Sequence, residues 1–82
     1  MSTTKYLVYR NGSNRANQSL CNKLAVAIVA ATSRQEACRI AQENLTFYAN
    51  QVAEAVPQSK ASQSDWKFVS EMAAQSSEFF VG

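Results

Sequence analysis

The chain has 82 residues, of which 46% are hydrophobic and 17% charged, a composition typical of globular rather than disordered proteins. Histidine is absent and cysteine occurs twice, so a structural zinc site, which needs about four ligands, is not expected. No apolar run approaches the roughly 18 residues of a membrane span, and the first residues lack an apolar signal core. We therefore predict one domain over residues 1–82, located in the cytoplasm and without membrane contact.

Residues 5–10, KYLVYR, predict a first strand because they are rich in aromatic and β-branched side chains. Asn11-Gly12 follows as a turn signal, but the next residues are too polar to bury one face of a second strand. We therefore expect a long polar loop over residues 11–22, NGSNRANQSLCN, whose side chains favour local bonds to the backbone. Alternation divides the strand into one face with Tyr6, Val8 and Arg10 and another with Lys5, Leu7 and Tyr9.

Residues 24–31 form an unbroken apolar run, LAVAIVAA. Its length and β-branched residues predict a second strand over 23–31, antiparallel to residues 5–10. A buried helix segment is the alternative, because alanine is the best helix former. Alternation predicts a bulky face turned to the core, with Leu24, Val26, Ile28 and Ala30, and a small face with Ala25, Ala27, Val29 and Ala31. The small face is expected to be exposed, or else pressed against another backbone.

A capping box begins the next element. Ser33 is followed three residues later by Glu36, and Thr32 with Gln35 repeats the pattern one residue earlier. The helical period then predicts one long amphipathic helix that ends at Val56, before Pro57. Its expected apolar face consists of Ala37, Ala41, Leu45, Tyr48, Val52 and Val56.

After Pro57, residues 58–64 are expected to form a polar linker. Ser64 or Asp65 is expected to cap a second helix, whose core-facing arc holds Trp66, Val69, Ala73 and Phe80. Residues 79–81 fit either the end of this helix or a short strand. The predicted fold class is thus α+β: an antiparallel β-hairpin with a long loop, packed against two helices in the order β-β-α-α, with a possible short C-terminal strand.

The sequence contains little that suggests chemistry. Without histidine the commonest general base and metal ligand is missing, no glycine-rich phosphate loop is present, and the carboxylates are scattered. We expect no enzymatic activity, no cofactor and no metal. Cys21 and Cys38 are expected to be reduced, because the strand between them spans roughly 25 Å, far beyond the limit of about 7 Å between the Cα atoms of a disulfide.

Charge is unevenly distributed. Residues 1–40 carry six basic side chains and one acid, net +5, whereas residues 41–82 carry two basic and five acidic side chains, net −3. Such asymmetry suggests an anionic partner. RNA or DNA binding by the basic amino-terminal half is therefore one interpretation, because tyrosines stack on bases and cations contact phosphates.

The favoured interpretation is a protein partner, so that the chain acts as a small adaptor, regulator or inhibitor; self-association into homo-oligomers is a further interpretation. Sheet edges pair with other chains, and an exposed strip with Ala25, Ala27 and Val29 would offer apolar area. The alternative is that the second helix covers this strip. Binding is expected through the sheet edge or face and the loop over 11–22. The candidate binding residues are Tyr6, Tyr9, Arg10, Asn11, Asn14, Arg15, Asn17 and Lys23.

Overall fold

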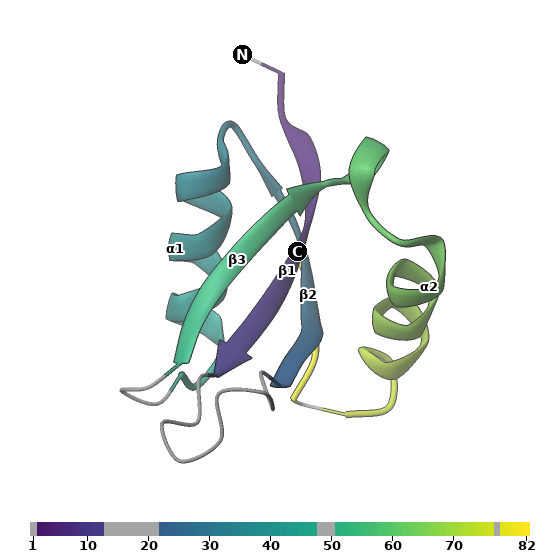
Figure 1. The fold of residues 1–82 in the computed structure, drawn as a ribbon. Helices are drawn as coiled ribbons and strands as arrows, with labels where there is room; N and C mark the ends of the chain where they lie inside the picture. Colours follow the sequence, from purple (N-terminus) through teal and green to yellow (C-terminus); the bar gives the residue numbers. More distant parts are fainter. Residues whose placement is uncertain (1, 13–21, 48–50, 77) are drawn as a thin grey trace.

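The computed structural model describes residues 2–12, 22–47, 51–76 and 78–82. Within these ranges, four strands form one open mixed sheet in the order β3-β1-β2-β4, together with two α-helices (Figure 1). The predicted α+β class is confirmed. In chain order the elements are β1 (Thr4–Gly12), β2 (Asn22–Ala31), α1 (Arg34–Asn44), β3 (Gln51–Pro57), a 3₁₀ turn η1 (Gln58–Lys60), α2 (Gln63–Met72) and β4 (Phe80–Val81).

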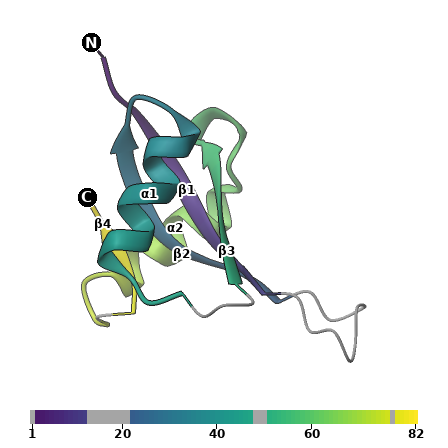
Figure 2. The same ribbon diagram turned by 90° about the vertical axis from the view of Figure 1, so that its left-hand side faces the viewer.

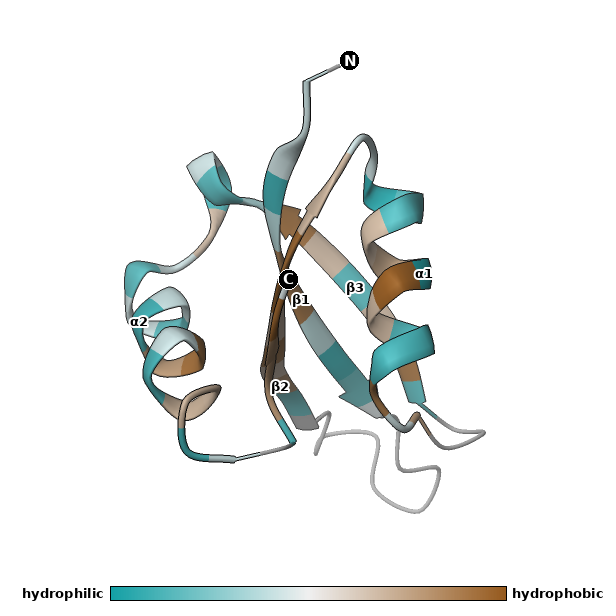
Figure 3. Cartoon of the chain, turned by 180° about the vertical axis from the view of Figure 1, so that it is seen from behind, coloured by the Kyte–Doolittle hydropathy of each residue, from teal (hydrophilic) through white to brown (hydrophobic). Residues whose placement is uncertain are grey.

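The direction of the strands explains where the helices lie. β1 is antiparallel to both β2 and β3, and β4 is parallel to β2, so β2, β3 and β4 all run the same way. The connection β2-α1-β3 crosses the sheet in one direction and β3-α2-β4 crosses it in the other. Because such crossovers are nearly always right-handed, opposite directions require opposite faces. Figure 3 shows α1 and α2 on the two sides of the sheet.

The sheet therefore has a core on each face. The α1-side core contains Val8, Val29 and the helix residues Ala37 and Ala41. The α2-side core contains Leu7, Ile28 and Val69. Many α1-side positions are alanines, so the helix and the strands approach closely. The alanines of this core are Ala27, Ala31, Ala37, Ala41 and Ala55.

Strand β2 has the expected antiparallel pairing with β1, but a bulge changes its faces. Val8 pairs with Ala27 and Tyr9 with Ala25, so Val26 is an extra residue. Val26 and Ala27 both join the α1-side core, whereas Ala25 and Ile28 join the α2-side core. The predicted bulky and small faces are therefore wrong. Of the two alternatives for the strip with Ala25, Ala27 and Val29, exposure is wrong, because all three residues are buried. Covering by the second helix holds for Ala25 alone, since Ala27 and Val29 belong to the α1-side core.

The predicted long helix is correct in its start and wrong in its end. The Ser33 hydroxyl accepts a hydrogen bond from the Glu36 amide at 3.1 Å, and the Glu36 carboxylate accepts one from the Thr32 hydroxyl at 2.7 Å. The helix ends at Asn44, whose side-chain amide donates to the Ile40 carbonyl. Residues 51–57 form strand β3, because backbone pairing with β1 outweighs their local helical pattern. Tyr48, in the predicted apolar face, lies outside the described residues.

The second helix begins earlier than predicted. Its N-cap is Ser62, whose hydroxyl accepts from the Asp65 amide at 3.4 Å, and not Ser64 or Asp65. The segment expected to be an irregular linker contains η1. At the other end, Phe80 and Val81 form the short strand β4, which settles the choice left open by the sequence. Gly82 continues the pairing, since its amide donates to the Ile28 carbonyl at 2.8 Å.

Candidate functional site

The predicted binding residues do not form one surface. Tyr6 and Arg10 lie on the α1 side of β1, and Tyr9 lies on the α2 side together with Lys23. Asn11 lies opposite Lys23 and Val52 near the end of the sheet. Three further candidates lie outside the described residues, as does most of the loop predicted over 11–22: Asn14, Arg15 and Asn17.

On the α2 side, Tyr9 is the centre of a polar cluster. Its hydroxyl donates to the Asp65 carboxylate at 2.5 Å, which joins β1 to the first turn of α2. The Lys23 ammonium lies 4.9 Å from the centre of the Tyr9 ring and 3.0 Å from the Glu54 carboxylate. Lys23 thus reaches across β1 from β2 to β3. These charged groups bind one another, and the cluster holds α2 against the sheet.

The surroundings of Tyr9 change its acidity. Burial, the hydrogen bond to Asp65 and the negative charges of Asp65 and Glu54 raise the pKa of Tyr9 to about 12. All three causes disfavour the phenolate. Burial removes water from the charged form, the hydrogen bond to Asp65 needs the neutral hydroxyl as its donor, and the two carboxylates repel a negative charge on the ring. Tyr9 is therefore a neutral hydrogen-bond donor at physiological pH, and the cluster is suited to a structural role.

On the α1 side, Arg10 has a comparable structural role. Its guanidinium donates to the Thr46 carbonyl at 2.9 Å and lies 5.2 Å from the centre of the Phe47 ring. These contacts hold the chain that follows α1 against β1. The buried Arg10 Nε has no hydrogen-bond partner within the described part of the chain. Arg10 and Lys23, two of the cations expected to meet an anionic partner, are thus both engaged by groups of this chain.

Cys38 lies on α1 beside strand β3. Its thiol donates to the Ala53 carbonyl at 3.6 Å, and it is a free cysteine. Burial raises the pKa of this thiol and the charge of Glu54 raises it further, whereas a backbone hydrogen bond from Ala55 lowers it. Cys21 lies outside the described residues. The contacts with Ala53 and Ala55 place the Cys38 sulfur against the backbone of β3, which is an edge strand of the sheet. Pro57 at the end of β3 has no backbone N–H that could pair with a strand of another chain.

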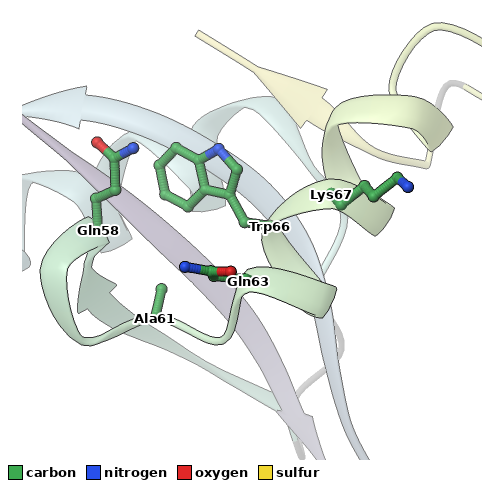
Figure 4. Close-up of a pocket in the computed structure, with 5 residues that line it drawn as sticks. All are labelled: Gln58, Ala61, Gln63, Trp66 and Lys67. Atoms are coloured by element: carbon green, nitrogen blue, oxygen red, sulfur yellow. The ribbon is translucent and has the colours of Figure 1, made fainter.

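A pocket opens where η1 leads into α2. The Ala61 amide donates to the Gln58 carbonyl and closes the 3₁₀ turn, and the Trp66 amide donates to the Ser62 carbonyl in the first turn of α2. These local bonds bring together the five residues in Figure 4. The Trp66 pocket is lined by Gln58, Ala61, Gln63, Trp66 and Lys67.

The side chains of this pocket have distinct positions. Figure 4 shows the Trp66 indole facing the side chains of Gln58 and Gln63, while the Lys67 ammonium is directed away from the indole. Trp66 is half-buried, because it also packs against the α2-side core. Sequence reasoning assigned Trp66 to the core alone. The polar residues 58–64 immediately before it were a signal that one side of the indole lies at a boundary with solvent.

A second hollow lies at the start of α1 and is lined by Ser33, Gln35, Glu36 and Arg39. It is wider and more open than the Trp66 pocket, and its lining is polar. Its charged groups have partners on the same helix or in its cap, since Arg39 pairs with Glu43 at 2.7 Å and Glu36 accepts from Thr32. Figure 2 shows α1 in front of the sheet and α2 behind it, so the two hollows lie on different sides of the molecule.

Large exposed hydrophobic residues are spread over several elements. Val52 on β3 is 58% exposed, and Phe68 on α2 is 40% exposed. Phe68 also makes an edge-to-face contact with Phe79, with ring centres 5.3 Å apart. Within the described ranges the others are Leu24 and Val81.

Among the described residues, no helix is long and apolar enough to cross a membrane. No group of three or more His, Cys, Asp or Glu side chains in the same ranges is placed to hold a metal ion. Comparison of the chain with protein-family models, with curated proteins and with solved structures found no match.

Proposed function

We propose that this chain is a small non-enzymatic binding protein that captures a segment of a partner protein at the Trp66 pocket, and so acts as an adaptor, regulator or inhibitor. The observation that carries the proposal is the half-buried indole facing two carboxamide side chains across an open hollow. Tryptophan is among the residues that contribute most to protein interfaces, particularly where it is held in place by surrounding packing.

The size of the pocket favours part of a macromolecule over a free small molecule. Its volume is about 200 Å³, whereas pockets for drug-sized ligands and cofactors have about 300–1,000 Å³. A hollow of this size accommodates one or two side chains of a longer segment. The remaining contact area would then come from the surrounding surface of η1 and α2.

The alternative of nucleic-acid binding has less support. Phosphate contacts need cations that are free to replace counterions. Arg10 is engaged by Thr46 and Phe47, and Lys23 by Glu54 and Tyr9. Base stacking needs exposed aromatic rings, but Tyr9 is only 9% exposed and Tyr6 packs against the α1-side core. These contacts favour a protein partner.

Selection of peptides from a displayed random library on the purified chain tests the proposal. Enriched peptides should bind the unmodified protein and lose about tenfold in affinity, or about 1.4 kcal/mol, when Gln58→Ala and Gln63→Ala are combined. Both glutamines are exposed, so this double variant should fold normally.

The matched control combines Gln35→Ala and Gln42→Ala, two exposed glutamines of α1 on the other side of the sheet. This control should bind as tightly as the unmodified protein. The proposal fails if no peptide is enriched, or if both double variants bind the enriched peptides equally well.

A further inference from the structure

We infer that the Trp66 pocket takes an uncharged, proline-containing segment in the extended polyproline II conformation. This inference rests on the proposed function and adds the chemical class of the ligand. Its basis is the kind of side chain in the pocket: one flat apolar surface, from Trp66, beside two carboxamides, from Gln58 and Gln63.

Charge decides the first property of the ligand. Of the five lining residues, Lys67 alone is charged, and its ammonium is directed away from the indole. A charged ligand group against the indole would find no opposite charge directed at it and would lose part of its water to the apolar ring, which is unfavourable. The part of the ligand that enters the pocket is therefore neutral.

Hydrogen bonding decides the conformation. Each glutamine side chain offers two N–H donors and one carbonyl acceptor. A polyproline II segment has no internal hydrogen bonds and keeps its backbone carbonyls available to such donors. Proline has no N–H of its own, so a proline-containing segment presents mainly acceptors. It is also ordered before binding, which lowers the entropic cost of association.

The other common ways of binding a peptide fit this site less well. A bound amphipathic helix needs an apolar groove long enough for anchors at positions i, i+3, i+4 and i+7. The Trp66 pocket, with about 200 Å³, has too little volume for the anchor side chains of two helical turns. A bound strand needs a free sheet edge, whereas this pocket is formed by a 3₁₀ turn and a helix. A proline ring against the indole, with the side-chain amides of Gln58 and Gln63 donating to neighbouring carbonyls of the ligand backbone, would use both the apolar surface and the donors of the pocket.

The test uses the intrinsic fluorescence of Trp66, which is the chain's one tryptophan. A capped oligoproline peptide should change its emission saturably, and a capped glycine-serine peptide of equal length should not. The apparent affinity for oligoproline should fall about tenfold in the Gln58→Ala, Gln63→Ala double variant and stay unchanged in the Gln35→Ala, Gln42→Ala control.

An equal response to the two peptides, or no response to oligoproline, would overturn this inference. The library selection separates that failure from failure of the proposed function. Enriched peptides without proline that still depend on Gln58 and Gln63 would retain the proposed function and exclude this ligand class. An oligoproline response that is the same in both double variants would place the binding site elsewhere and would also count against the inference.

Discussion

Replacing Tyr9 by phenylalanine tests how α2 is held against the sheet. The change removes the hydroxyl that donates to Asp65 at 2.5 Å and keeps the buried ring. A hydrogen bond to a charged group contributes about 1.5–3 kcal/mol. Asp65 is half-buried and can bind water in the variant, so we expect a loss near the lower limit, about 1.5 kcal/mol. In a domain of this size, 1 kcal/mol corresponds to about 4–8 °C in Tm, and the predicted decrease is about 6–12 °C.

The measurement is urea denaturation followed by circular dichroism, carried out as a double-mutant cycle with Asp65→Ala. The cycle removes the separate effect of losing an acid from the first turn of α2, so a coupling of about 1–2 kcal/mol should remain. A coupling near zero would show that the Tyr9–Asp65 contact does not stabilise the fold.

The pH dependence of the same variant has a defined sign. The pKa of Tyr9 is about 12 in the folded protein and about 10 in an unfolded chain. Stability that comes from the neutral phenol is therefore fully present below pH 10 and is lost as the pH rises through 12. Tyr9→Phe cannot ionise at this position, so its deficit relative to the unmodified protein should shrink between about pH 10 and pH 12. A deficit that grows over this interval would contradict the assignment.

Two further substitutions and one labelling experiment test the α2 cap and the packing. Ser62→Ala should lower the free energy of unfolding by about 1 kcal/mol in denaturant unfolding, because the α2 cap is lost. Ser64→Ala should have little effect. A larger loss from Ser64→Ala than from Ser62→Ala would refute the observed helix start. Ala41→Leu should destabilise the fold by about 1–3 kcal/mol or more, because the residue is fully buried in the closely packed α1-side core. Gln42→Leu, on the exposed side of the same helix, should not destabilise it. Equal unfolding midpoints for the two variants would contradict close packing. Cys38 should react with a thiol reagent much more slowly in the native protein than after denaturation, because burial raises its pKa; equal rates would contradict its burial.

The region after α1 shows where local sequence patterns fail. Residues 51–57, QVAEAVP, fit a helical period, yet they also alternate, with Ala53 and Ala55 on the α1 side and Val56 on the α2 side. The helical period and the alternation are both present in the same seven residues. Pairing with β1 selects the strand, and pairing between residues that are 39 to 51 positions apart is not visible in a local pattern. The opposite holds for Ser33, where the cap depends on neighbours three residues apart and was predicted correctly.

The candidate site shows a related limit. Composition indicated cations near the amino terminus, but it did not indicate that Arg10 would contact Thr46 and that Lys23 would contact Glu54, each from a distant part of the chain. The same holds for the bulge at Val26, which turns neighbouring residues to unexpected faces. The Trp66 pocket is formed by residues close in sequence. It was missed because an aromatic residue at a helical spacing was assigned wholly to the core.

The most direct test of a partner segment bound at the Trp66 pocket is a heteronuclear NMR titration of the isotope-labelled full chain. The added ligand should be a peptide enriched in the library selection. Binding at this pocket predicts that the largest shifts occur at the Trp66 indole N–H and at the amides of residues 58–67, which contain the five residues of the pocket. Shifts centred instead on residues 5–12 and 22–24, with the indole signal unmoved, would contradict it and return the binding surface to the amino-terminal strands.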